Sequence, residues 1–489
     1  MISRNIIPPP KCRCLVLCQT ATLVSACLML LGGCAQLPSG EKQIGIKPVG
    51  QYQAQESFSG RQTSWPDDQW WRAYGDAQLD ALIAEGLKDS PTMAIAEARL
   101  RRAKSLILVA DSALQPQVNA HGSATMQKQS YNYLMPGSVT PQGWNDYGQA
   151  TLDFSWEIDF WGKNRAALEA ATSLQEASAA DAAQARLALT SSIASAYGEL
   201  DRLYALHDTV GAAINVRKKN LELLQKRRKH GMETLGSVRQ SEARKASTEE
   251  DLLVLDEQIS LQRNRIAALI GAGPDRGLAI SRPNISGAKN FGIPRQMQLE
   301  LIGRRPDIVA ARLRVEASEK SIEKQRAEFY PNINLSAFIG LQSLGLNKLT
   351  DSGSRFGSVG PAISLPIFNG GRLRGQLRST QAEHDEAVGN YNLTVTQALQ
   401  EVADAAVSQR ALGKRLEKLE QEVAAARDAH RNVKLRYEGG LSNYLDVLSS
   451  EEILLSSLRT LRDMQSRSFT LDVALIKALG GGYQAAVKN

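Results

Sequence analysis

The sequence predicts an α+β membrane protein whose mature chain consists of two similar halves. Three observations lead to this prediction: landmark residues recur at a nearly constant offset, short segments alternate between apolar and polar residues, and long segments without proline follow them. Each half is expected to contain a helix, two strands and then two long helices.

The internal repeat is visible in landmark residues that the two halves share. Agreement at so many places with similar spacing is hard to obtain by chance. The paired landmarks are Pro91 with Pro306, Pro116 with Pro331, Gly162 with Gly370, Gly231 with Gly440, and Gly271 with Gly480. The resulting division is residues 1–33 as a signal peptide, 34–74 as an N-terminal extended segment, 75–275 as the first repeat, 276–294 as a linker, 295–482 as the second repeat and 483–489 as a C-terminal tail.

Four segments show the two-residue period that is typical of strands. In the first of them, Val118 and Ala120 alternate with Asn119 and His121. Such strands have one apolar and one polar face. They fit either a soluble sandwich that buries the apolar face, or a barrel with lipid outside and a water-filled lumen inside. The four segments are 117–127, 147–160, 332–342 and 358–368.

Three features favour the barrel. The strands are long enough to cross a bilayer at a tilt, and aromatic residues such as Tyr131 and Trp144 mark their ends. The polar face carries Asp153, Glu157 and Asp159, which a sandwich interior would not accept unpaired. Four strands cannot close a barrel, and open strand edges are not tolerated in hydrocarbon. Several chains must therefore share one barrel, although the strand count does not fix how many.

The long segments predict helices that return on themselves. Residues 163–228 contain no proline, and about 65 residues of helix span roughly 100 Å. A return helix over 235–270 follows, and the second half repeats the pattern over 372–437 and 444–479. Such lengths suggest coiled coil. On the helices alone, a solid stalk and a hollow tube are equally good interpretations, and a strand-walled pore would favour the tube.

The N-terminal residues have the layout of a secretory signal. Positive residues precede a mostly apolar run, which ends in Leu31-Gly32-Gly33-Cys34. This ending resembles a bacterial lipobox and predicts that Cys34 carries an N-acyl and diacylglycerol lipid. Cys27 follows a similar pattern and is the alternative site. Ala35, where an Asp would mark retention elsewhere, favours the outer membrane by resemblance to lipoproteins in general. No later stretch is long and apolar enough for a transmembrane helix.

Composition argues against several classes of function. All five cysteines precede residue 35, so the body has no thiol nucleophile or Cys-ligated metal, and the five histidines are scattered. The formal charge of +7 arises from positive residues interleaved with acids, which does not indicate nucleic-acid binding. No motif of a hydrolase, nucleotide-binding loop or metalloprotease is present. We therefore expect no catalytic, cofactor-binding or metal site, and no enzyme.

Taken together and in order, the motifs resemble the outer-membrane efflux proteins of the TolC-like class, in particular their NodT-type lipoprotein branch. The resemblance extends from about Trp70 to Tyr483. Its main pieces are Tyr74-Gly75-Asp76-Ala77, Phe160-Trp161-Gly162, Arg304-Arg305-Pro306-Asp307, Phe329-Tyr330-Pro331-Asn332, Phe368-Asn369-Gly370-Gly371, and Arg436-Tyr437-Glu438-Gly439-Gly440.

The resemblance implies a homotrimer in which four strands per chain form a 12-stranded barrel, continuous with a periplasmic helical barrel. It implies a passive channel that exports drugs or other toxic compounds across the outer membrane, together with a periplasmic adaptor protein and an inner-membrane pump. The alternative is a coiled-coil scaffold or adhesin lipoprotein, which would not conduct.

The resemblance also implies a closed periplasmic aperture at the helix turns near Gly231 and Gly440. Tyr437 and Asp446 match the family's aperture residues in the second repeat. The chain departs from the pattern at two positions. Ser237 stands where the family has a second Asp, and Ser442 stands where some members have an Arg.

Overall fold

The computed structural model describes residues 44–52, 62–132, 136–285, 293–294 and 297–485. Cys34, Cys27 and the rest of the predicted signal peptide lie outside these ranges. Contacts divide the chain into two compact units, and each unit contains segments from both halves of the sequence. One unit contains Ser105–Ser173 and Val315–Ala387, and the other contains Ile46–Lys104, Leu174–Arg314 and Val388–Asn489.

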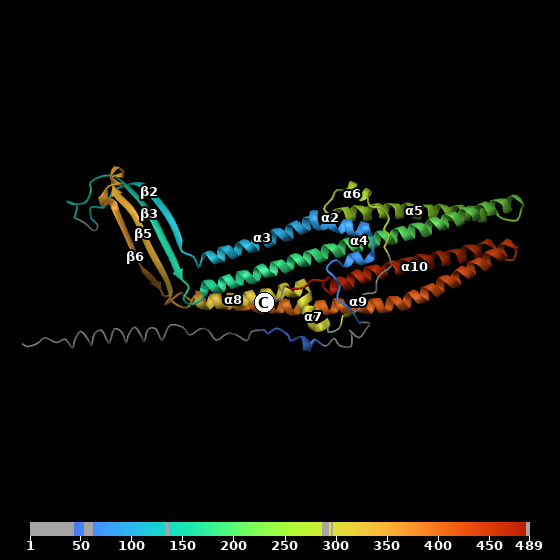
Figure 1. The fold of residues 1–489 in the computed structure, drawn as a ribbon. Coiled ribbons are helices and arrows are strands. Elements are labelled where there is room, and N and C mark those ends of the chain that lie inside the picture. The colour runs from blue at the N-terminus through green and yellow to red at the C-terminus, as the bar shows by residue number, and fades with distance from the viewer. Residues whose placement is uncertain (1–43, 53–61, 133–135, 286–292, 295–296, 486–489) are drawn as a thin grey trace, which may run out of the picture. The chain divides into compact units, whose positions relative to one another are not determined.

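The first unit contains an antiparallel four-stranded sheet in the order β2-β3-β5-β6 (Figure 1). The first half of the chain supplies one hairpin of this sheet and the second half supplies the other. The pairing of β3 with β5 therefore joins the two halves. The strands are β2 (Gln117–Gln127), β3 (Asn145–Ile158), β5 (Asn332–Leu344) and β6 (Arg355–Ser364).

The register gives this sheet one apolar face that crosses all four strands. Val118 lies opposite Phe154, which lies opposite Ala337, which in turn lies opposite Val359. Val359 is 78% exposed, so none of the residues that the structure describes covers the face at that point. On the other face, Asp153 accepts a hydrogen bond from Thr151 at 2.8 Å.

The strand ends differ from the sequence prediction in three of the four strands. β3 covers 145–158 instead of 147–160, and β5 covers 332–344 instead of 332–342. β3 ends at Ile158, and the Asp159 carboxylate instead accepts the backbone N–H groups of Asn164 and Arg165 at the start of the next helix. β6 covers 355–364 instead of 358–368, and Pro366, which has no N–H to donate to a ladder, follows two residues later.

The single helix expected at the start of each half is interrupted. In the first half, α2 (Ala77–Asp89) ends before α3 (Pro91–Ser112), because Pro91 cannot continue the hydrogen-bond pattern of the preceding turn. In the second half, α7 (Met297–Arg304) and α8 (Pro306–Ala327) are separated in the same way at Arg305.

The long helices form two hairpins of equal length, α4 (Lys163–Lys229) with α5 (Leu235–Leu269) and α9 (Arg372–Glu438) with α10 (Tyr444–Ala478) (Figure 1). Both first helices end in a Schellman motif. Gly231 has φ +74°, and Met232 donates to the Arg227 carbonyl at 2.9 Å. Gly440 has φ +77°, and Leu441 donates to the Arg436 carbonyl at 2.8 Å. None of the helices in the described ranges has the length and apolar composition required to cross a bilayer.

The core of the second unit lies where α2 packs against the long helices. Leu79, Ile83, Ile193 and Ile266 are fully or almost fully buried there. Asp76 caps α2 and also accepts a hydrogen bond from the Tyr197 hydroxyl at 2.8 Å.

Two segments expected to lack regular structure contain short elements. The segment predicted as extended, 34–74, includes the 3₁₀ helices Val49–Gln51 and Trp70–Tyr74. The predicted linker contains most of α6 (Pro274–Leu278), and β4 (Ile293–Pro294) within it pairs in parallel with β1 (Gln62–Thr63).

An acidic side chain is buried in this unit. Asp472 on α10 is 1% exposed, and its Oδ1 accepts a hydrogen bond from Gln409 at 2.8 Å. Its Oδ2 and the hydroxyl of buried Tyr74 have no hydrogen-bond partner among the described residues. Burial raises the pKa of Asp472 to about 7.

This raised pKa predicts a pH-dependent stability. An unfolded Asp has a pKa of about 3.9, so the folded state binds the extra proton, and stability falls as the pH rises from about 4 through 7. At about 1.4 kcal/mol per pKa unit, Asp472→Asn should gain roughly 2–4 kcal/mol at pH 8 and little at pH 4. Thermal unfolding midpoints across this pH range measure the difference.

Asp463→Asn on the same helix is the matched control. The Asp463 carboxylate accepts a hydrogen bond from Arg202 at 2.8 Å, so its neutralisation should not stabilise the protein at any pH. If Asp472→Asn and wild type had equal thermal unfolding midpoints at pH 8, this would contradict the raised pKa of Asp472.

Candidate functional site

The candidate site is the pair of turns that close the two long hairpins. All six predicted aperture residues lie in or next to these turns: Gly231 and Ser237 at the first turn, and Tyr437, Gly440, Ser442 and Asp446 at the second. Both lie in the second unit. The backbone is nearly the same at the two turns, because each has a Schellman motif followed by a capped helix. Thr234 caps α5 and Asn443 caps α10.

Tyr437 joins the two turns. It is 3% exposed and belongs to a small apolar cluster with Leu224 and Val447. Its hydroxyl donates to Glu233 Oε1 at 2.6 Å, and Glu233 is in the other turn. The Arg227 guanidinium lies 4.6 Å from the centre of the Tyr437 ring and donates to the Tyr437 carbonyl at 3.2 Å.

The electrostatics keep Tyr437 protonated. Burial is the largest cause that raises its pKa, and the hydrogen bond to Glu233 raises the pKa further. The phenol is therefore a stable donor, and the bond to a carboxylate is charge-assisted. Tyr444 contributes a second, neutral link between the hairpins, because its hydroxyl donates to Ser241 Oγ on α5 at 3.2 Å.

Asp446 and Ser442 contact each other within the second turn. The Ser442 hydroxyl donates to Asp446 Oδ2 at 2.7 Å. Asp446 is exposed and lies in the first turn of α10, where the helix dipole favours a negative charge. Ser237 holds the corresponding position of α5 and bonds with Thr234 of its own turn.

Three contributors to this site were not predicted from the sequence. Glu233 provides the acceptor for Tyr437, Arg227 covers the ring, and Tyr444 links to α5. Glu233 lies two residues after Gly231, so it is the counterpart of Ser442. A comparison of the two repeats at that position would have drawn attention to the acid.

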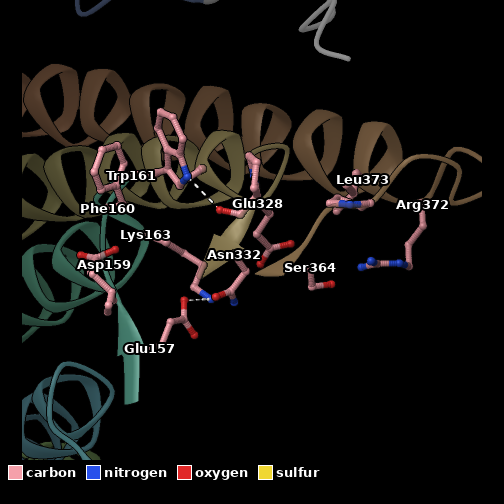
Figure 2. A pocket seen from close by; sticks show the side chains of 14 residues that line it. Glu157, Asp159, Phe160, Trp161, Lys163, Glu328, Asn332, Ser364, Arg372 and Leu373 are labelled. Carbon is pink, nitrogen blue, oxygen red and sulfur yellow. Dashed lines mark hydrogen bonds and ion pairs between the residues drawn. The ribbon is translucent and has the colours of Figure 1, made fainter. Parts of the chain in front are cut away.

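The first unit contains a hollow of about 200 Å³ at the ends of the strands (Figure 2). Lys163 forms an ion pair with Glu157 at 2.5 Å, and Trp161 stacks on Tyr330 with ring centres 4.7 Å apart. The Trp161 indole donates to the Pro331 carbonyl at 2.8 Å. Because these polar groups bond to one another and no cysteine or histidine lines the hollow, we interpret it as a structural junction.

The Tyr437–Glu233 bond predicts a measurable change at the turns. Tyr437→Phe keeps the ring beneath Arg227 but removes the hydrogen bond to the carboxylate, which is worth about 1.5–3 kcal/mol when one partner is charged. We expect backbone amides around Gly231 and Gly440 to exchange about tenfold faster or more in hydrogen-exchange mass spectrometry.

Tyr444→Phe is the control for this experiment. It removes only a longer bond between two hydroxyl groups, so its effect should be clearly smaller. Wild-type exchange rates in Tyr437→Phe would mean that the Glu233 contact does not hold the turns together.

Comparisons with known proteins support the same family as the sequence motifs. The family described as "Outer membrane efflux protein" matches residues 82–272 and 299–481. The chain is 32% identical to the multidrug resistance outer membrane protein MdtP of Escherichia coli (strain K12), over 93% of this chain and 95% of the relative.

Two solved structures extend the likeness to the fold. The outer membrane protein VceC from Vibrio cholerae is 49% identical, with a TM-score of 0.81 over 86% of this chain and 100% of that one. The outer-membrane channel OprN is 28% identical, with a TM-score of 0.80 over 92% and 98% of the two chains. The predicted resemblance and fold class are confirmed, and the chain belongs to the outer membrane efflux protein family.

Proposed function

We propose that the protein is the outer-membrane duct of a tripartite export system, and that it has no catalytic activity. The observation that carries this proposal is a four-stranded sheet with a continuous apolar face in the same chain as two long helical hairpins. A lipid-facing wall and a long helical conduit are the parts that a passive channel requires.

Three copies of the chain could close their sheets into one barrel. Within the described residues, β2 and β6 are the edge strands of the sheet, and their outer edges have no partner in this chain. Unpaired edges are not tolerated in hydrocarbon, and three sheets of four strands form a 12-stranded barrel. Because the family resemblance implies a barrel of this size, a homotrimer is the assembly that we propose.

A passive duct does not itself convert energy, so the proposed system needs partners that do. A periplasmic adaptor protein and an inner-membrane pump would supply the substrate and the energy. The name of MdtP connects that relative with multidrug resistance, which supports drugs or other toxic small molecules as the cargo here.

The turns are the proposed aperture. In a trimer, three copies of Asp446 at one constriction would concentrate negative potential and favour cations. The Tyr437–Glu233 bond would keep each pair of hairpins closed, and opening would require it to break.

The test is single-channel conductance of the folded, trimeric protein in planar bilayers. We expect a small conductance that prefers cations. Asp446→Asn keeps the acceptor for Ser442 but removes the charge, so the permeability ratio of cations to anions should move toward one. The reversal potential in a salt gradient measures this ratio.

Ser237→Asp is the matched variant, because it adds an acid at the corresponding position of the first turn and should strengthen the preference for cations. An unchanged ratio in both variants would remove Asp446 from the aperture. No conductance from any folded, trimeric variant would favour the scaffold or adhesin lipoprotein instead.

We also propose that Cys34 is the lipidated first residue of the mature protein. Mass spectrometry of the mature N-terminal peptide should show a modified cysteine followed by Ala35, and Cys34→Ala should abolish the modification. A modified peptide that begins at Cys27 would assign the lipid to the alternative site.

A further inference from the structure

A buried charged network connects α10 with α4 and α5, outside the turns themselves. The Arg217 Nε of α4 donates to Glu451 Oε1 of α10 at 2.9 Å, and Asn220 donates to the other carboxylate oxygen at 3.1 Å. The Nη1 atom of Arg217 donates to the Arg244 carbonyl at 2.9 Å and to the hydroxyl of Thr248, both on α5. The Arg217 guanidinium and the Glu451 carboxylate thus link α4, α5 and α10 through hydrogen bonds.

The network is removed from water. Arg217, Asn220, Thr248 and Glu451 are all between 1% and 9% exposed. A nearby ion pair between α5 and α10, Arg244 with Glu452 at 2.7 Å, is far more exposed, at 38% and 58% of the two side chains. Buried charges are costly unless every hydrogen bond is made, so the geometry of the buried pair is strongly restricted.

Among the described residues, the arginine–carboxylate pair of this network has no counterpart at the equivalent place in the other hairpin. The residues of the second repeat that correspond to Arg217 and Asn220 are Ala426 and Ala429. The counterpart of Glu451 is Glu242, which instead pairs with Arg239 of its own helix at 2.7 Å. The repeat therefore does not explain the network, which serves the contact between the two hairpins of one chain.

The network lies close to the turns along the same helices. Glu451 follows Tyr444 by about two helical turns, or roughly 10 Å of helix. Between the network and the turns, apolar side chains such as Leu224 and Val447 pack together, and Tyr444 donates a hydrogen bond to Ser241. Tyr437 lies near the end of α9, and its ring centre is 5.8 Å from that of Tyr444 on α10, so a movement of α10 along α4 and α5 would also move Tyr437 relative to Glu233.

We propose that Arg217 and Glu451 are positioning residues that fix the register of α10 against α4 and α5, so that the Tyr437–Glu233 contact can form. The inference rests on the proposed function only where it concerns opening of a channel. A shift of α10 by a fraction of a turn would carry the adjoining end of α9 with it and separate the Tyr437 hydroxyl from Glu233, while the apolar surfaces stayed in contact.

The test removes both charges at once with Arg217→Met/Glu451→Met. Replacement of both partners of a buried pair by apolar side chains of similar size is often neutral for stability, whereas removal of one leaves an unpaired charge. We expect a thermal midpoint close to that of wild type, but about tenfold faster amide exchange around Gly231 and Gly440, within the usual range of coupling between sites.

Arg244→Met/Glu452→Met is the matched control, because it removes an exposed ion pair between the same two hairpins. Its exchange rates at the turns should equal those of wild type. If the buried double variant fails to fold, Arg217→Lys replaces it. That variant keeps the charge paired but lacks the rigid, planar arrangement of donors of a guanidinium, and faster exchange at the turns is again expected.

Wild-type exchange at the turns in a folded variant of the buried pair would overturn the inference. Conductance separates this outcome from a failure of the proposed function. If Glu233→Gln opens the channel and the buried double variant does not, the inference is wrong and the channel function stands. If no variant conducts but exchange at the turns still rises in the buried double variant, the positioning role stands and the channel function is wrong.

Discussion

The antiparallel pairing of β3 with β5 is the interaction on which the sheet depends, because neither half of the chain supplies more than a two-stranded hairpin. Such a hairpin is marginally stable alone. The register sets Leu152 opposite Ile339 and Phe154 opposite Ala337, so the apolar side chains of both halves share a face. A slip by one residue would move one hairpin's apolar side chains to the polar face. The continuous apolar wall is thus a property of the joined halves.

The helical hairpins also depend on contacts between the two halves of the chain, but these contacts are mainly polar pairs. Their long faces carry many alanines and polar residues, and small apolar side chains specify the position of one helix along another only weakly. Polar pairs such as Arg202 with Asp463 and Arg459 with Asp251 recur between the first hairpin and α10. Exposed pairs of this kind contribute little free energy, but each is satisfied at one register. The buried Arg217–Glu451 pair restricts that register most strongly.

Periodicity in the sequence predicted the strands and long helices well, because these features are local. β2 spans 117–127 as expected, and the turn glycines end α4 and α9. The breaks at Pro91 and Pro306 were visible in the sequence but were not used to divide the helices. The contact between Tyr437 and Glu233 could not be predicted in this way, since it depends on the rotation and register of helices from different halves. The burial of Asp472 also could not be predicted from the sequence, because an acid on a long helix is usually solvated.

The two turns share a backbone but differ in the side chains that form the contact between them. The bond between Tyr437 and Glu233 joins two positions that are not equivalent, so identical repeats would form it twice. The counterpart of Tyr437 is Arg228, and the counterpart of Glu233 is Ser442. Because Glu233 supplies the acceptor, Asp446 is not needed for that bond. Its carboxylate is held by Ser442 and remains exposed. In the proposed channel, the divergence of the repeats would thus let Glu233 keep the turns closed while the Asp446 carboxylate sets the electrostatic potential there.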